Sequence, residues 1–459
     1  MSENKSKGTA ARIDMLHGPM LGKILLFALP LAASSCLQQL FNSVDVAVAG
    51  RLVGREALAA VGSNAPVISL MINLFVGISM GANVVIANHI GQHNATGIRR
   101  AVDTSLVTAA ASGLLLMATG CAAARPILTA MDTPADIIGP ATRYLRIIFA
   151  GMPFMMIFNF SAAILRSMGD TRRPLYILVA AGVVNTGLNL FLIAVCGMGV
   201  EGVAVATVAA HGVSAALVLR LLRREGEPLR LHRRLQPSRR ELSRMLQIGV
   251  PAGVQGMVFS LANIFIQSSV NRYGSAAVAG NAAALNYEYY CYFFVSAFTA
   301  ACVTFVSQNY GARRFGRCRR TVRLTMGLAL ASCLALNVFF VWQKELSIGL
   351  FTTDAEAFVY GATRLETVLL LQWMACSYEI TGGALRGMGH SALPALLTVF
   401  GTCALRLAWV YLVAPGVRSF RFLLSVYPLS WALTGAMVCA AYVVVSRRAF
   451  AGRAPGEAL

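Results

Sequence analysis

A chain of 459 residues with 57% hydrophobic and only 13% charged residues is too apolar for a soluble globular domain, in which roughly a quarter of residues are charged. A formal net charge of +20 would suggest nucleic-acid binding in a soluble protein, but here the mean hydropathy is +0.65. Composition therefore excludes a soluble globular protein, argues against a nucleic-acid partner, and indicates a polytopic membrane protein.

Twelve apolar segments of membrane-spanning length predict an all-α protein with twelve transmembrane helices. If the N-terminus is cytoplasmic, most of the 39 Lys and Arg residues fall in cytoplasmic loops. We therefore expect a multi-pass protein of the plasma or inner membrane with both termini in the cytoplasm. The segments run over about 22–49, 57–88, 101–124, 137–164, 174–196, 200–221, 242–270, 275–307, 322–343, 357–384, 394–414 and 420–446.

The ten cysteines lie singly in apolar surroundings, without a Cys-x-x-Cys pair. Such cysteines are typical of small core residues. We accordingly expect neither a disulfide framework nor a protein-bound cofactor.

The chain repeats itself after roughly 220 residues. LRSMGD at 165–170 falls on LRGMGH at 385–390, and prolines 30 and 251 each open a half. Six helices per half make the repeat parallel, as in transporters that alternate between two bundles. We predict an N-terminal tail (1–20), a first lobe (21–221), a cytoplasmic inter-lobe loop (222–241), a second lobe (242–446) and a C-terminal tail (447–459).

The first predicted helix carries a carboxylate, Asp45, near its far end. Gln38, Asn42 and Asp45 are spaced four and three apart, which places them on one helix face. An acid inside the bilayer costs roughly 2.5–3.5 kcal/mol, so it marks a functional site by default. The alternative is a solvated acid at the membrane interface.

Polar side chains in the fifth and sixth predicted helices are candidate partners of this acid. Asn185 and Asn189 are four residues apart and share a face, and Thr207 lies in the next helix. With Asp45 they would form an oxygen-rich site for Na⁺, or a carboxyl group that takes and releases a proton. The competing interpretation is that the amides only satisfy one another.

The second half has polar groups in a different pattern. Its first helix carries Gln255 and Asn263 but no carboxylate, whereas Glu288 and Tyr292 share the next helix and Glu379 lies in the tenth. Acids beside aromatic rings favour binding of an amphipathic cation.

An alternative for the two glutamates is a buried salt bridge with Arg364 or Arg406. The sequence leaves both interpretations open. The candidate substrate-cavity residues are Gln38, Asn42, Gln255, Asn263, Glu288, Tyr292 and Glu379.

From about residue 13 to 448 the chain resembles the multidrug and toxic compound extrusion (MATE) transporters. The resemblance rests on Pro30 and Asp45 in the first helix, QNYGAR at 308–313, the paired LRSMGD and LRGMGH segments, Asn185, and GVEGVAVAT at 199–207. It implies two six-helix lobes around a central cavity and export of cationic, lipophilic compounds in exchange for H⁺ or Na⁺. Carried over by position, Asp45 corresponds to the coupling acid, with Asn185 and Thr207 as neighbours.

One departure concerns the coupling ion. Some members have a second acid where this chain has Asn189, and its absence favours H⁺ over Na⁺. We expect a monomeric antiporter that exports cationic drugs. The alternatives are a flippase for lipid-linked saccharides and, less favoured, an intramembrane enzyme, for which no metal or nucleophile motif is present.

Overall fold

The computed structural model describes residues 12–131, 133, 137–232, 234–413 and 419–451. Within these residues the regular secondary structure is helical, as predicted, and strands are absent. Parts of the predicted tails, and the last residue of the predicted segment 394–414, lie outside the described residues. A helix satisfies its own backbone hydrogen bonds, which the interior of a bilayer requires.

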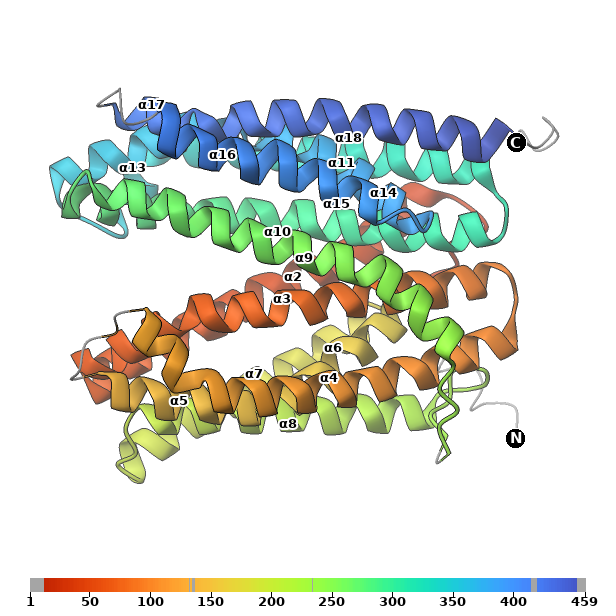
Figure 1. The fold of residues 1–459 in the computed structure, drawn as a ribbon, viewed down its shortest axis with the longest axis horizontal. Coiled ribbons are helices and arrows are strands. Elements are labelled where there is room, and N and C mark those ends of the chain that lie inside the picture. The colour runs from red at the N-terminus through yellow and green to blue at the C-terminus, as the bar shows by residue number, and fades with distance from the viewer. Residues whose placement is uncertain (1–11, 132, 134–136, 233, 414–418, 452–459) are drawn as a thin grey trace. The chain divides into compact units, whose positions relative to one another are not determined.

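The described part of the first half contains seven α-helices, drawn from red to yellow-green in Figure 1. They are α2 (Met20–Val48), α3 (Arg55–Gly91), α4 (Ala95–Ala130), α5 (Ile138–Ala150), α6 (Met152–Ser167), α7 (Arg172–Leu190) and α8 (Val200–Arg224).

The second half contains four long α-helices and several short ones. They are α9 (Arg239–Asn271), α10 (Ser275–Gly311), α11 (Phe315–Trp342), α12 (Lys344–Gly349), α13 (Ala355–Thr367), α14 (Ala375–Gly387), α15 (Ala392–Thr398), α16 (Leu405–Ala408), α17 (Phe420–Leu424) and α18 (Val426–Ala451).

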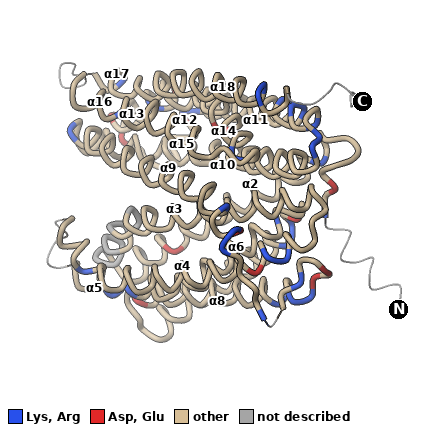
Figure 2. Tube along the Cα trace, turned by 45° about the vertical axis from the view of Figure 1, so that its right-hand side comes forward, with Lys and Arg blue, Asp and Glu red and all other residues tan. Residues whose placement is uncertain are grey.

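Ten helical segments of the described chain are long and apolar enough to cross a membrane. The pair α5 and α6, bent by 44° at Gly151, supplies an eleventh. The predicted segment 357–384 is instead divided into α13, a 3₁₀ turn at Leu369–Met374 and α14. Figure 2 shows Lys and Arg chiefly near helix ends and loops, with long uncharged stretches between them.

The described residues form two compact units that do not coincide with the two halves of the sequence. The first unit comprises 12–14 and 33–253, and the second comprises 15–32 and 254–451. Each unit thus contains part of α2 and part of α9, divided close to Pro30 and Pro251. The predicted lobes, 21–221 and 242–446, differ from these units at those two helices, and their boundaries stay a prediction.

Within each unit, neighbouring helices pack side by side: α7 on α8 in the first, and α10 on α11 in the second (Figure 1). The repeated LRSMGD and LRGMGH segments form matching turns. Gly169 and Gly389 follow the ends of α6 and α14 with φ of +88° and +91°, a conformation that favours glycine. Asp170 then accepts a hydrogen bond from the backbone N–H of Arg173 in the first turn of α7.

A glycine allows α2 to approach α7 in the first unit. A Cβ atom on Gly182 would lie 1.9 Å from the ring of Phe41, one turn before Asp45 on α2. Gly182 lies one turn before Asn185 on α7. This close approach brings the carboxylate of α2 to the asparagines of α7.

We predict that Gly182→Leu separates α2 from α7 and lowers both the unfolding temperature and transport, because overpacking costs about 1–3 kcal/mol. Gly187→Leu is the matched control on α7, since no atom lies within 4 Å of that added Cβ. Thermal unfolding of the purified chain, followed by fluorescence, measures the effect. Adding Phe41→Ala should restore stability to Gly182→Leu; equal losses in the two leucine variants would contradict the explanation.

Candidate functional site

The carboxylate of Asp45 lies near the end of α2, between side chains of α7 and α8. Asn189 Nδ2 donates to its Oδ1 at 2.5 Å, and Thr207 Oγ1 lies 3.2 Å from its Oδ2. Asn189 is fully buried, whereas Asp45 and Thr207 are half-buried. The structure therefore brings the predicted acid together with two of its predicted partners.

Asn185 links these partners. Its Nδ2 donates to Thr207 Oγ1 at 3.3 Å, and its Oδ1 accepts from Asn189 Nδ2 at 3.4 Å. The one-turn spacing of the asparagines on α7 allows this, as the sequence indicated. All four predicted coupling residues, Asp45, Asn185, Asn189 and Thr207, thus belong to one hydrogen-bonded cluster.

The cluster has more acceptors than donors. Asn189 Oδ1 is buried and has no hydrogen-bond partner among the described residues. Thr207 has a single hydroxyl proton but two nearby acceptors, Asp45 Oδ2 and, at 2.9 Å, the carbonyl oxygen of Val203. Leaving a buried acceptor unsatisfied costs about 1–3 kcal/mol. A proton or a small cation at this point would satisfy the surplus oxygen atoms.

The other predicted polar residues of α2 lie apart from this cluster. Gln38 and Asn42 are exposed, and neither forms a side-chain hydrogen bond with a described residue. They share the helix face of Asp45 but lie closer to the start of α2. The described residues also contain no group of three or more His, Cys, Asp or Glu side chains fit to hold a metal.

In the second unit, Glu288 and Arg364 form a buried ion pair. Arg364 Nε and Nη2 lie 2.6 and 2.9 Å from the two carboxylate oxygens, and Arg364 Nη1 donates to Asn281 at 2.6 Å. Both partners are buried. This is the salt-bridge arrangement that the sequence left open for Glu288.

Glu379 has no such partner. Its Oε1 accepts a hydrogen bond from the hydroxyl of Tyr292 at 3.2 Å, and no Lys or Arg among the described residues lies within ion-pair distance. Tyr292 is 37% exposed and Glu379 is half-buried. An acid beside an accessible aromatic ring is chemically suited to an organic cation.

Gln255 and Asn263 both accept hydrogen bonds from arginines. Arg386 Nη2 donates to Gln255 at 2.9 Å, and Arg406 Nη1 donates to Asn263 at 3.3 Å. Arg406 is 1% exposed, and its guanidinium lies 4.4 Å from the ring centroid of Tyr427. Arg364, the partner of Glu288, lies 5.0 Å from the same ring, so Glu288 and Asn263 belong to neighbouring polar groups. That all seven predicted residues line one substrate cavity stays a prediction.

Sequence reasoning missed the surroundings of Arg386 and Arg406. The available signal was a charged residue within an apolar run, which usually needs a buried partner. It could reveal that partners exist, but not that Gln255 binds Arg386 or that Asn263 and Tyr427 lie against Arg406.

The comparisons with known proteins agree with this arrangement. The MatE family model matches residues 30–191 and again 251–412, in line with the predicted repeat. Among curated relatives, the probable multidrug resistance protein YoeA of Bacillus subtilis is 29% identical over 82% of this chain and 83% of its own. The probable multidrug resistance protein NorM of Thermotoga maritima is 26% identical over 84% of each. The FAD transporter of Shewanella oneidensis is 25% identical over 75% of this chain and 77% of its own.

Solved structures show the same fold. A crystal structure of MATE in complex with MaD3S matches with a TM-score of 0.88 at 22% identity, over 95% of this chain and 98% of that one. A MOP superfamily transporter from Pyrococcus furiosus matches with a TM-score of 0.87 over the same shares. The predicted twelve-helix, two-lobe fold class is confirmed. Since the two family matches together cover well over half of its length, the chain belongs to the MatE family of membrane transporters and is not an enzyme.

Proposed function

We propose that this protein is a secondary active antiporter that exports amphipathic cations and takes up H⁺ in exchange. The observation that carries the proposal is the Asp45 cluster, in which a carboxylate and the unpartnered Asn189 Oδ1 lie together in an apolar bundle. Such a site holds a proton or Na⁺ more readily than it stays empty. We favour H⁺ because a single carboxylate provides little negative charge to replace the hydration shell of Na⁺.

The cycle follows from the cost of an ionised Asp45 in the membrane interior. With Asp45 ionised, the first unit carries an acid in its membrane interior; with Asp45 protonated, the hydroxyl can donate to Thr207 Oγ1 or to Asn189 Oδ1. Protonation therefore changes which hydrogen bonds α2, α7 and α8 make. A change of this kind biases the two states of an alternating-access cycle, with the substrate bound in one and H⁺ in the other.

The substrate class is supported by the names of the relatives and by one acid, Glu379. YoeA and NorM are named as multidrug resistance proteins, whereas another relative is named as an FAD transporter. We assign cation binding to Glu379 with Tyr292, because both oxygens of Glu288 are already bound by Arg364. Gln38, Asn42, Gln255 and Asn263 remain proposed cavity residues.

We further propose a monomer in the plasma or inner membrane, with both termini cytoplasmic. The excess of Lys and Arg in the loops that follow a cytoplasmic N-terminus supports the orientation.

We predict that Asp45→Asn reduces ethidium efflux from cells to the rate of cells without the protein, because the amide takes up no proton. Proteoliposomes with an imposed pH gradient or an imposed Na⁺ gradient identify the coupling ion. Asp354→Asn, an exposed helix-capping position, is the control for expression and handling. Unchanged efflux in Asp45→Asn would refute the assigned role, and transport driven by Na⁺ alone would refute H⁺ coupling.

We predict opposite consequences for the two glutamates of the second unit. Glu379→Gln should raise the KM for a monocationic dye several-fold with little change in unfolding temperature, because it removes an accessible charge. Glu288→Gln should instead lower the unfolding temperature, because losing one partner of a buried ion pair costs about 3–5 kcal/mol. Dye transport and thermal unfolding of both purified variants test this, and the reverse pattern would move the substrate contact to Glu288.

A further inference from the structure

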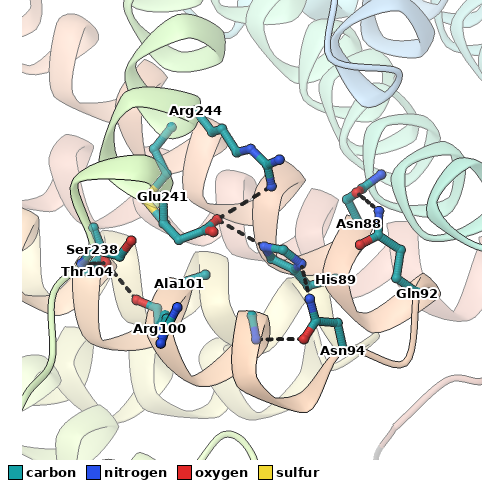
Figure 3. A network of polar contacts seen from close by, with 12 residues as sticks. Asn88, His89, Gln92, Asn94, Arg100, Ala101, Thr104, Ser238, Glu241 and Arg244 are labelled. Atoms are coloured by element: carbon teal, nitrogen blue, oxygen red, sulfur yellow. Dashed lines mark hydrogen bonds and ion pairs between the residues drawn. The ribbon is translucent and has the colours of Figure 1, made fainter.

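A cavity of about 200 Å³ lies in the first unit, where the end of α3, the start of α4 and the start of α9 meet (Figure 3). Side chains from all three helices line it, among them His89, Asn94, Arg100, Arg240, Glu241 and Arg244. The α9 residues belong to the first unit, since α9 leaves it only after Gly253. Neither the Asp45 cluster nor the proposed transport cycle uses this cavity.

Hydrogen bonds fix the histidine at the base of the cavity. Asn94 caps α4 by accepting from the N–H of Gly97 at 2.9 Å, which turns its Nδ2 toward His89 Nδ1 at 3.5 Å. Nδ1 is then the acceptor, so Nε2 carries the proton and donates to Glu241 at 2.9 Å. Both His89 and Glu241 are more than nine-tenths buried. This network, drawn in Figure 3, joins the ends of α3 and α9.

The cavity has a surplus of positive charge. Glu241 is the single carboxylate among its lining residues, and it receives the His89 N–H and lies 4.0 Å from Arg244. Arg100 and Arg240 form no side-chain hydrogen bond or ion pair with any described residue, and both are exposed. The cavity thus has three arginines and one carboxylate, and that carboxylate already contacts His89 and Arg244. The guanidinium groups of Arg100 and Arg240 are therefore available to an anion.

The chemistry of these groups specifies the anion. Guanidinium groups bind phosphate oxygens through paired N–H donors, more specifically than lysine does. The 36-residue helix α4 begins at the cavity, so its positive end adds to the same field. The cavity also lies at the ends of two candidate membrane spans, Val67–Gly91 and Arg239–Asn271, where lipid headgroups are found.

We propose that this cavity binds a phosphate group, carried by an anionic membrane phospholipid or free in solution, between Arg100, Arg240 and Arg244. Bound phosphate would bridge the starts of α4 and α9 and thereby hold the first turns of α9 on the first unit. The site is independent of proton coupling, so loss of the Asp45 role would leave this proposal standing.

The experiment uses the purified full chain. The protein is placed in nanodiscs of phosphatidylcholine with or without phosphatidylglycerol, and native mass spectrometry then counts the anionic lipids that stay bound. Thermal unfolding in detergent, with and without inorganic phosphate, tests whether free phosphate binds. We expect Arg100→Gln combined with Arg240→Gln to weaken retention of anionic lipid, or the stabilisation by phosphate, at least about tenfold. Arg223→Gln with Arg224→Gln, two exposed arginines at the end of α8, removes the same net charge as the control.

The outcomes separate the sources. Retention of phosphatidylglycerol that millimolar phosphate does not displace identifies a lipid, and stabilisation by phosphate alone identifies a soluble ligand; either supports the proposal. Equal losses in the two double variants, or no binding of either probe to the native chain, would overturn it. If the Arg100→Gln, Arg240→Gln variant unfolds at a lower temperature than the native chain, the single variant Arg240→Glu is used in its place. Unchanged binding in Arg240→Glu would also overturn the proposal.

Discussion

An ionised carboxylate in an apolar helix bundle is stable only if other groups replace the water that it loses, and the first unit depends on this constraint at Asp45. The replacement consists of one amide donor from α7 and a hydroxyl from α8, without a cationic side chain within ion-pair distance among the described residues. Neutral donors stabilise the charge less than an arginine would. The acid is therefore held by neutral groups alone, which is the feature on which the proposed proton coupling rests.

In the second unit, the buried acid Glu288 is stabilised by a cationic side chain instead of by neutral donors. Its acid Glu288 is neutralised by Arg364 through two short contacts, and the guanidinium is further satisfied by Asn281. Both guanidinium groups, of Arg364 and Arg406, also lie within about 5 Å of the ring centroid of Tyr427. The two units thus differ at these two acids: neutral groups hold Asp45, whereas a buried arginine binds Glu288. Duplication preserved the turns at Gly169 and Gly389 but did not preserve the charges.

The sequence predicted the fold class well because spans are set by length and apolarity, which are local properties. It also indicated that Asp45, Asn185 and Asn189 would lie together, because the asparagines follow helical spacing and Asp45 stands out as a charge in an apolar run. It could not predict which arginine binds Glu288, since Arg364 and Arg406 were equally plausible by type. Nor could the sequence assign parts of α2 and α9 to different units. For α9 that assignment depends on close helix packing, in which Gly249 and Gly253 lie against Gly77 and Leu74 of α3.

The division of α2 and α9 also bears on the descent of the chain. The start of the first repeat completes the second unit, and the start of the second repeat completes the first. Neither repeat alone therefore encodes a complete compact unit. A single-repeat chain with this packing would need a second copy, each lending the beginning of its opening helix to the other, as in a domain-swapped dimer.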